Sequence, residues 1–245
     1  MTKGFVIMAQ GDVYVKCATA LEQSIKKVMP AANVTIITSD MLPHGDLGGF
    51  ANDWQVYECS PYDETIKLEA DMILPRTIDH WWDILGQQDV VVSSTIRNFM
   101  GEISDIRAYR KFIDDNNLPD VYNAITYFKK SDTASRFFGI VRDIFENWEE
   151  YKATLKCNPQ EEASTDWAYA IACHIMTPEK TMMPGFTEMS IIHMKQFING
   201  MPTEDWTDTL VYEILPHVIR VNTVPQMYPF HYHVKDFSDK LLGVV

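Results

Sequence analysis

Glu69 and Asp71 lie one residue apart near the end of a mostly apolar stretch that runs from Asp63 to Leu74. Side chains alternate between the two faces of a strand, so a strand here would place both carboxylates on one side. Two carboxylates that close repel each other unless a cation lies between them or both reach solvent. Mg²⁺ and Mn²⁺ take oxygen ligands and are often shared between carboxylates and substrate phosphates. The pair therefore indicates a divalent metal site, and a solvated strand end is the alternative.

The composition limits the class of the protein and its partners. The 245 residues include 21 basic and 34 acidic side chains, so the net charge is −13. Such a charge repels nucleic acid and anionic membranes on average. The hydrophobic content of 46% is that of a folded protein, and the length suits one α/β domain. We expect a single domain over residues 1–245, with a core over 1–200 and a C-terminal extension over 201–245.

The cysteines and the N-terminus indicate the cellular compartment. Four cysteines lack both CxxC spacing and the density of a disulfide scaffold, so we expect reduced thiols: Cys17, Cys59, Cys157 and Cys173. The first apolar run is too short for a signal peptide, and no segment is long enough to span a bilayer. We therefore expect a cytoplasmic protein without a membrane partner.

The N-terminal segment predicts a β-α-β unit. Residues 5–9 form a continuous apolar run typical of a buried strand, residues 13–29 have helical periodicity, and residues 34–38 predict a second strand. A right-handed crossover would make these strands parallel, and ligands bind beyond the carboxyl ends of such strands. Four polar residues follow the two strands: Gln10, Asp12, Ser39 and Asp40. Gly11 is the only glycine of this turn, which argues against a dinucleotide-binding loop.

Alternating strands and helices are predicted for the remainder of the core. Residues 44–53 predict a glycine-rich loop. In chain order the other elements are an edge strand near 54–58, the carboxylate strand over 63–74, a helix over 78–85, a β-rich run over 89–95, a helix over 104–116, a strand over 121–128, a helix from 131 to 148, a helix over 165–175 and a strand over 190–194. This alternation is typical of an α/β protein.

Five segments in collinear order resemble motifs of the GT-A glycosyltransferases, and of their glycogenin-like branch, glycosyltransferase family 8, in particular. Residues 66–74 are similar to the "YLDADMIV" strand, residues 8–15 to the opening motif, and residues 120–128 to the "YFNAGVMLF" segment. Residues 164–167 resemble the start of the "DQ" helix, and residues 191–193 the "VVHF" strand with its metal histidine. The compact, acidic chain also resembles members encoded by bacteriophages.

The resemblance implies a GT-A (Rossmann-like) fold, whose mixed, mainly parallel sheet is flanked by helices. It also implies roles for residues at matching positions. Mn²⁺ or Mg²⁺ would be bound by Glu69, Asp71 and His193. The nucleotide sugar would contact Gln10, Asp12, Tyr14, Ser39, Asp40 and Lys195. Asn123 and Asp166 would face the sugar and the reacting centre in catalytic roles, although a turn and a helix cap are the alternatives for these two.

Three departures from the family pattern bear on the metal shell and on the acceptor side. Glu69 replaces the first aspartate of the DxD motif, and Trp167 replaces the glutamine of the "DQ" pair. The "HxxGxxKPW" motif is absent, and Lys195 follows His193 by only two residues. His231 and His233 could bind a metal, but a histidine pair without a third ligand is usually structural, so we leave both outside the predicted site.

The resemblance implies transfer of a sugar from a nucleoside-diphosphate sugar, with UDP as the best nucleotide, to an unknown hydroxyl acceptor and with retention of configuration. Protein, glycan, small molecule and modified DNA base all stay open as acceptors. A phage-type enzyme acting on hydroxymethylated cytosine would need a local basic face: Lys129, Lys130, Arg136 and Arg142. A nucleotidyltransferase of similar fold is a further alternative, but its glycine-rich signature is missing, and a non-catalytic binding module is another.

Overall fold

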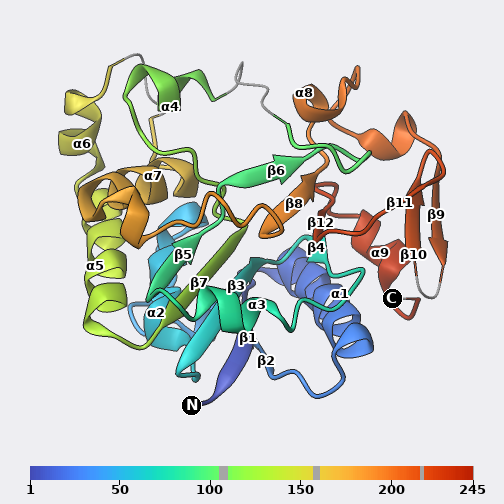
Figure 1. The fold of residues 1–245 in the computed structure, drawn as a ribbon, viewed down its shortest axis with the longest axis horizontal. Coiled ribbons are helices and arrows are strands. Elements are labelled where there is room, and N and C mark those ends of the chain that lie inside the picture. The colour runs from blue at the N-terminus through green and yellow to red at the C-terminus, as the bar shows by residue number, and fades with distance from the viewer. Residues whose placement is uncertain (105–109, 157–160, 216–217, 245) are drawn as a thin grey trace.

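The computed structural model describes residues 1–104, 110–156, 161–215 and 218–244 (Figure 1). Cys157 and most of the N-terminal half of the helix expected over 104–116 lie outside these ranges. Three cysteines within them are free thiols: Cys17, Cys59 and Cys173. No helix in the described part of the chain is both long and apolar enough to cross a membrane.

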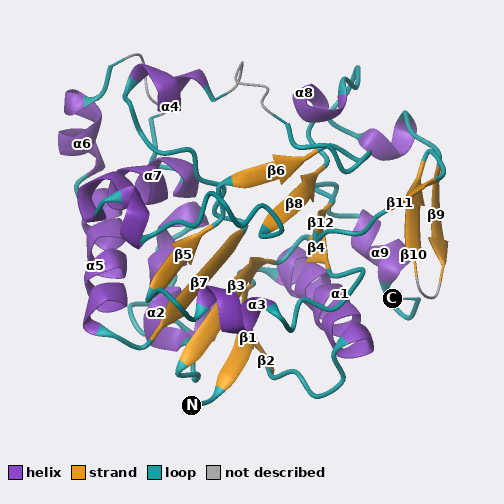
Figure 2. Ribbon diagram, in the orientation of Figure 1, coloured by secondary structure: helices purple, strands orange, loops and turns teal. Residues whose placement is uncertain are grey.

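A five-stranded mixed sheet forms the centre of the molecule (Figures 1 and 2). Its strands, in spatial order, are β2 (Val34–Ile37), β1 (Lys3–Met8), β3 (Glu64–Glu69), β7 (Ile125–Lys129) and β5 (Val90–Val92). β1 pairs in parallel with β2 and β3, whereas β7 is antiparallel to β3 and β5. The predicted α/β class and the parallel β-α-β opening are confirmed.

The continuous apolar run in β1 packs against two different layers. Phe5 and Ile7 belong to one hydrophobic cluster, which includes buried residues of α1 (Asp12–Val28). Val6 and Met8 belong to a second cluster. This alternation follows from the two-residue period of a strand, and it explains why every residue after Lys3 in β1 is buried.

Helices α5 (Asp132–Glu146) and α7 (Thr165–Met176) supply the second layer, on the side of the sheet opposite α1 in Figure 2. Both helices begin at a serine. The Ser131 and Ser164 side chains accept hydrogen bonds from the backbone amides of Ala134 and Trp167, which otherwise lack intrahelical partners. The expected helix from 131 to 148 ends earlier, at Glu146, and a separate helix α6 (Trp148–Thr154) follows.

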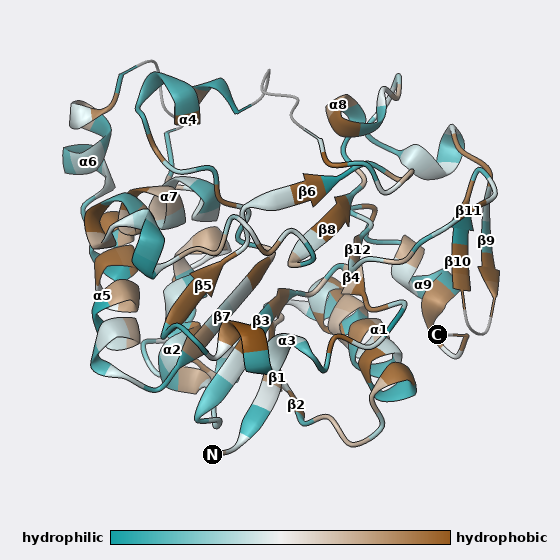
Figure 3. Cartoon of the chain, viewed as in Figure 1, coloured by the Kyte–Doolittle hydropathy of each residue, from teal (hydrophilic) through white to brown (hydrophobic). Residues whose placement is uncertain are grey.

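A second, four-stranded sheet brings late segments beside the carboxylate motif. Its order is β4 (Met72–Ile73), β12 (Phe230–His231), β8 (Ser190–His193) and β6 (Thr95–Arg97). His231 pairs with Met72 on one side and with His193 on the other. Strands β5 and β8 are among the hydrophobic segments in Figure 3, in agreement with their full burial.

The remaining elements surround these two sheets. The short helices are α2 (Val56–Cys59), α3 (Trp81–Leu85), α4 (Lys111–Asp115), α8 (Gln196–Asn199) and α9 (Phe237–Leu241), with 3-10 helices at Ser39–Met41, Gly49–Gln55, Pro178–Lys180 and Trp206–Asp208. A third sheet contains β9 (Tyr212–Leu215), β10 (Val218–Val221) and β11 (Val224–Pro225).

Two predicted strands are wrong in part or in full. The edge strand near 54–58 is a 3-10 helix followed by α2, because Asn52 and Gln55 bond to the preceding loop: Asn52 Oδ1 accepts from the Leu47 amide at 2.8 Å, and Gln55 Oε1 from the His44 amide at 3.0 Å. The strand over 121–128 begins only at Ile125, since Asn123 lies in a turn and its Oδ1 accepts a bond from Thr126.

The carboxylate strand over 63–74 is also interrupted. β3 ends at Glu69, Ala70 and Asp71 form a turn, and β4 starts at Met72 in the second sheet. The prediction that Glu69 and Asp71 share one face of a continuous strand is therefore wrong. The chain changes sheets here because the Asp71 carbonyl accepts a bond from the Tyr232 amide at 3.1 Å.

We predict that Gly4→Ala lowers the free energy of unfolding by about 1–3 kcal/mol, the usual cost of overpacking. A Cβ at Gly4 would lie 2.4 Å from the Tyr62 ring, which a 2.7 Å hydroxyl–hydroxyl bond to Thr35 holds in place. Gly139→Ala on α5 is the control, since it meets no atom within 4 Å and should stabilise the helix. Urea denaturation measures both, and an unchanged midpoint for Gly4→Ala would contradict the expectation.

Candidate active site and metal centre

A cavity of about 730 Å³ lies where several strands end. Met8, Glu69 and His193, the last residues of β1, β3 and β8, all contribute to its wall. Eight of the residues predicted for the site line it: Gln10, Tyr14, Glu69, Asp71, Asn123, Asp166, His193 and Lys195. This is the position that a doubly wound sheet provides for ligands, beyond the carboxyl ends of its strands.

Asp71 is the most buried carboxylate of this cavity, with 3% of its surface exposed. Its Oδ2 lies 3.0 Å from His231 Nε2 and forms an ion pair with Lys235. Burial alone would raise the pKa of the Asp71 carboxyl, but His231 and Lys235 outweigh it and hold that pKa below its ordinary value. Asp71 is therefore an anion whose present partners are a histidine and a lysine from the C-terminal segment.

Glu69 reaches the same histidine from the end of β3. Its Oε2 lies 3.2 Å from His231 Nε2, and its side chain is 30% exposed. Burial raises the pKa of the Glu69 carboxyl, the charge of Asp71 raises it further, and His231 opposes both. The two carboxylates thus converge on one imidazole, although they do not share a strand face.

Three histidine rings lie together beside the carboxylates. His231 and His233 stack with ring centroids 3.9 Å apart, and His233 Nε2 lies 3.2 Å from His193 Nδ1. Burial lowers the pKa of His193 well below its ordinary value, and the neighbouring rings of His233 and His231 lower it further. Burial and then His231 lower the pKa of His233 in the same way. Both imidazoles are therefore neutral near pH 7 and have lone pairs that can bind a cation.

His231 and His233 are the residues that the sequence analysis left outside the site and that the structure places in the cavity wall. A signal for them was present. The pattern of a histidine followed two residues later by a lysine occurs at His193, the last residue of β8, and again at His233, two residues after the end of β12. Lys235, the lysine of the second copy, also lines the cavity.

The side chains here fit a divalent metal ion. Among the described residues, two overlapping sets have ligand atoms within 4.8 Å of one another: Glu69, Asp71 and His231, and His193, His231 and His233. His193, the predicted third ligand of the carboxylates, thus belongs to the imidazole set, and His231 is the histidine that contacts both carboxylates. Carboxylate oxygens and imidazole nitrogens are ligand types that first-row divalent ions accept.

A buried ionic network supports another part of the cavity wall. Lys67 Nζ lies 2.6 Å from Asp53 Oδ1, and Asp53 Oδ2 accepts bonds from Tyr169 Oη at 2.5 Å and from Asn123 Nδ2 at 3.1 Å. The Asn123 carbonyl accepts a further bond from Lys67 at 3.3 Å. Asn123 is therefore held in one orientation. Asp53 and Lys67 are not among the residues predicted for the site, because a lysine within a strand is normally a solvated side chain.

Asp166 lies in the first turn of α7 and is paired with a buried arginine. Arg110 Nη1 lies 2.6 Å from Asp166 Oδ2, and the guanidinium lies over the Tyr122 ring at 4.2 Å from its centroid. A negative side chain suits the helix N-terminus, but here it also has a direct cationic partner. The ion pair fixes the carboxylate at the cavity wall, 34% exposed.

The residues predicted to contact the nucleotide divide into two groups. Tyr14 lines the cavity with 43% of its surface exposed, and Gln10 lines it while donating a bond to the Ile37 carbonyl at 3.2 Å. Asp12, Ser39 and Asp40 are not among the described lining residues. Ser39 donates to Asp46 at 2.7 Å, and Asp40 accepts from Thr38.

Comparisons with known proteins show similarity in fold. No family model matches the chain, and no curated protein matches its sequence. An active-site mutant of LgtC matches with a TM-score of 0.52 and 11% identity, and the galactosyltransferase LgtC in complex with donor and acceptor sugar analogs with 0.50 and 12%. Each match covers 98% of this chain and 95% of LgtC.

The glycosyltransferase GlyE from Streptococcus pneumoniae TIGR4 matches with a TM-score of 0.50 and 8% identity over 98% of this chain and 60% of GlyE. The chain spans 48% of the apo form of GlyE and 39% of the bifunctional glycosyltransferase WbbM, about half or less of those proteins. The chain therefore has the GT-A glycosyltransferase fold, as the sequence analysis predicts.

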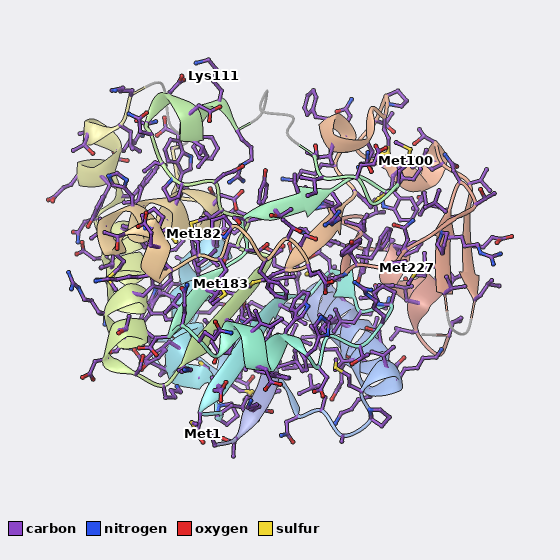
Figure 4. All side chains as sticks on the ribbon, viewed as in Figure 1. Met1, Met100, Lys111, Met182, Met183 and Met227 are labelled. Carbon is purple, nitrogen blue, oxygen red and sulfur yellow. The ribbon has the colours of Figure 1, made fainter. Side chains whose placement is uncertain are left out.

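We predict that Lys67→Met lowers the free energy of unfolding by about 3–5 kcal/mol, because Asp53 would become a buried charge without its cation. Lys111→Met is the matched control. Lys111 points outward from α4 (Figure 4), is 73% exposed and pairs with Asp115, so its loss should cost at most about 1 kcal/mol. Thermal and urea denaturation measure both, and equal stabilities for the two variants would refute the structural role of the Lys67–Asp53 pair.

Proposed function

We propose that this protein transfers a sugar from a nucleoside-diphosphate sugar to a hydroxyl acceptor. The observation that carries the proposal is the convergence of Glu69, Asp71 and His231 in one cavity at the carboxyl ends of the strands. The glycosyltransferase fold supports it. Release of free UDP from a panel of UDP-sugars, with and without Mn²⁺, tests it directly.

The donor diphosphate is assigned to the part of the cavity that holds most of the charged groups. Glu69, Asp71 and His231 would hold Mn²⁺ or Mg²⁺, with His193 beside them. Such an ion supplies Lewis-acid stabilisation of charge on the leaving diphosphate. The ammonium groups of Lys195 and Lys235 also line this cavity and can bind phosphate oxygens as point charges.

The uracil base is assigned to Tyr14 and Gln10, at the end of β1. The Tyr14 ring is exposed in the cavity, so a base can stack on it, and Lys235 Nζ lies 5.1 Å from the ring centroid. The base and the diphosphate would then bind on either side of Lys235. The same lysine contacts Asp71, which joins the two parts of the donor site.

The sugar and the acceptor are assigned to Asn123 and Asp166. Lys67 and Asp53 orient Asn123, which is 1% exposed, and Arg110 orients Asp166, whose 34% exposed carboxylate can contact the sugar. Trp167 lies next to them in place of the family's glutamine, and the Phe112 ring packs on it with centroids 4.1 Å apart. Retention of configuration, a place in the glycogenin-like branch, a phage origin and a cytoplasmic location belong to the same proposal and stem from the sequence.

The contacts of the basic side chains do not favour DNA as the acceptor. Lys129 donates to the Gly86 carbonyl at 2.6 Å, Lys130 donates to the Tyr57 carbonyl and Arg142 pairs with Glu146 at 2.7 Å, so three of the four basic side chains expected to face DNA are engaged elsewhere. None of the four basic residues is among the described residues of the cavity wall. A transfer assay should test all four classes of acceptor: protein, glycan, small molecule and modified DNA base.

We predict that Asp71→Asn abolishes UDP release while the protein stays folded. Asparagine keeps the shape but removes the charge that faces the cation and Lys235. Glu69→Asp should be milder, because it keeps a carboxylate. Asp83→Asn, an exposed change on α3, is the control and should match the wild type. Full activity of Asp71→Asn, or of the wild-type protein in excess chelator, would sink the metal-dependent mechanism.

We predict that Tyr14→Ala weakens UDP binding by about 1–3 kcal/mol, the value of one base stacked on an aromatic ring. Metal dependence should not change, because Tyr14 is not in either set of candidate ligands. Tyr14→Phe keeps the ring and should bind as well as the wild type. Calorimetry with UDP measures these affinities. If Tyr14→Ala binds UDP as tightly as the wild type, Tyr14 has a packing role and does not stack on the base.

A further inference from the structure

Three imidazoles converge from two segments that are distant in sequence. Parallel pairing of β8 with β12 sets His193 opposite His231. His233 follows two residues later with a backbone φ of 60°, in the left-handed region that few residues other than glycine adopt. That conformation is compatible with a ring that contacts both of the others, with centroid distances of 3.9 Å to His231 and 4.5 Å to His193.

The hydrogen bonds within the described residues leave part of this cluster unsatisfied. His231 Nε2 faces Asp71 and Glu69, but its Nδ1 is buried and has no partner. His233 Nε2 and His193 Nδ1 form a hydrogen bond with each other at 3.2 Å, so His231 Nδ1 is the buried atom of the described cluster without a partner. Buried polar atoms nearly always have a partner, and an unpaired one is costly. A bound cation would satisfy imidazole lone pairs that neighbouring side chains do not.

The chemistry of the cluster selects the kind of cation. Mg²⁺ prefers an octahedron of oxygens and gives up its water reluctantly. Imidazole suits Zn²⁺ and its first-row neighbours, and these ions bind nitrogen more strongly along the series toward copper. A histidine that ligates such an ion commonly donates its other N–H to a carboxylate, and Asp71 lies 3.0 Å from His231 Nε2 in that relation.

We propose that His193, His231 and His233 form a three-imidazole metal site that binds Zn²⁺, or Co²⁺ in its place, in preference to Mg²⁺. Three protein ligands leave a fourth position open, and because all three rings line the cavity, a ligand in the cavity can reach that position. His231 belongs to both sets of ligands, so an ion on the three imidazoles and an ion on Glu69, Asp71 and His231 exclude each other. The three-imidazole site does not depend on the proposed sugar transfer, since the imidazoles bind an ion whatever substrate the cavity takes.

Calorimetry on the full chain, freed of metal with chelator, tests this site with Zn²⁺ alone and Mg²⁺ alone. Zn²⁺ should bind with one high-affinity equivalent, and Mg²⁺ should bind far more weakly. Visible absorption of the Co²⁺ form reports nitrogen ligation independently of any activity. His193→Asn and His233→Asn should each weaken Zn²⁺ binding by at least about 10–100-fold, the range that loss of an outer partner already costs.

His174→Asn is the matched control, because His174 is an exposed histidine on α7 away from the cluster. Circular dichroism checks that each variant is folded, and His233→Gln replaces His233→Asn if that variant is not. Zn²⁺ affinity in folded His193 and His233 variants equal to that of His174→Asn would overturn the site, as would equal affinity of the wild-type protein for Mg²⁺ and Zn²⁺.

The Glu69→Gln variant tests the three-imidazole site separately from the proposed sugar transfer. It should retain the Co²⁺ spectrum, because Glu69 is outside the imidazole set, while it impairs UDP release. Loss of Zn²⁺ binding in Glu69→Gln together with full binding in His233→Asn would assign the ion to the carboxylates and overturn the three-imidazole site. Absence of UDP release from a wild-type protein with the Co²⁺ spectrum would refute sugar transfer and leave the metal site in place.

Discussion

The buried charge of Asp71 is the interaction on which the rest of the site depends. A carboxylate with 3% exposure is stable as an anion only beside compensating groups, and here they are His231 and Lys235. The same turn is joined to the second sheet by its backbone, because the Asp71 carbonyl accepts a hydrogen bond from the Tyr232 amide. Compensation of this charge thus joins the C-terminal segment and the histidine cluster to the turn, in addition to the strand pairs of β12 and the burial of Phe230 and Phe237.

The two sheets contribute different strand ends to the wall of the cavity. The central sheet places the ends of β1 and β3 at one edge, and two hydrophobic clusters on its faces hold it rigid. The four-stranded sheet adds the ends of β8 and β12 to the same region. Ion pairs then fix the polar side chains individually, as in the contacts of Asp53 with Lys67 and of Arg110 with Asp166.

Elements with local signals could be predicted from the sequence. The apolar run of residues 5–9, the periodicity after Asp12 and the predicted helix starts near 131 and at 165 all mark real boundaries, since these signals act within a few residues. Glu69 and Asp71, which a local family motif singled out, lie in the wall of the cavity. The glycosyltransferase fold that they indicated is the fold that the chain has.

The missed features all depend on contacts between distant segments. β12 has only two residues, too few to show a period, and its partners are β4 and β8. From the sequence alone, Lys67 is a polar residue on an ordinary strand. Only its ion pair with Asp53 shows that it belongs to a buried network. The break of the strand at Asp71 likewise depends on Tyr232, far along the chain, and no pattern near Glu69 reveals it.

The distance along the chain between Asp71 and its partners has a consequence for biosynthesis. All five strands of the central sheet are complete by Lys129, whereas His231 is 160 residues beyond Asp71. Closing so long a loop is entropically slow, and domains begin to fold during synthesis from the N-terminal side. We therefore expect a nascent chain to form its central sheet first and to carry the Asp71 carboxylate without its partners until His231 and Lys235 have been synthesised. The binding pocket would then assemble later than the sheet that supports it.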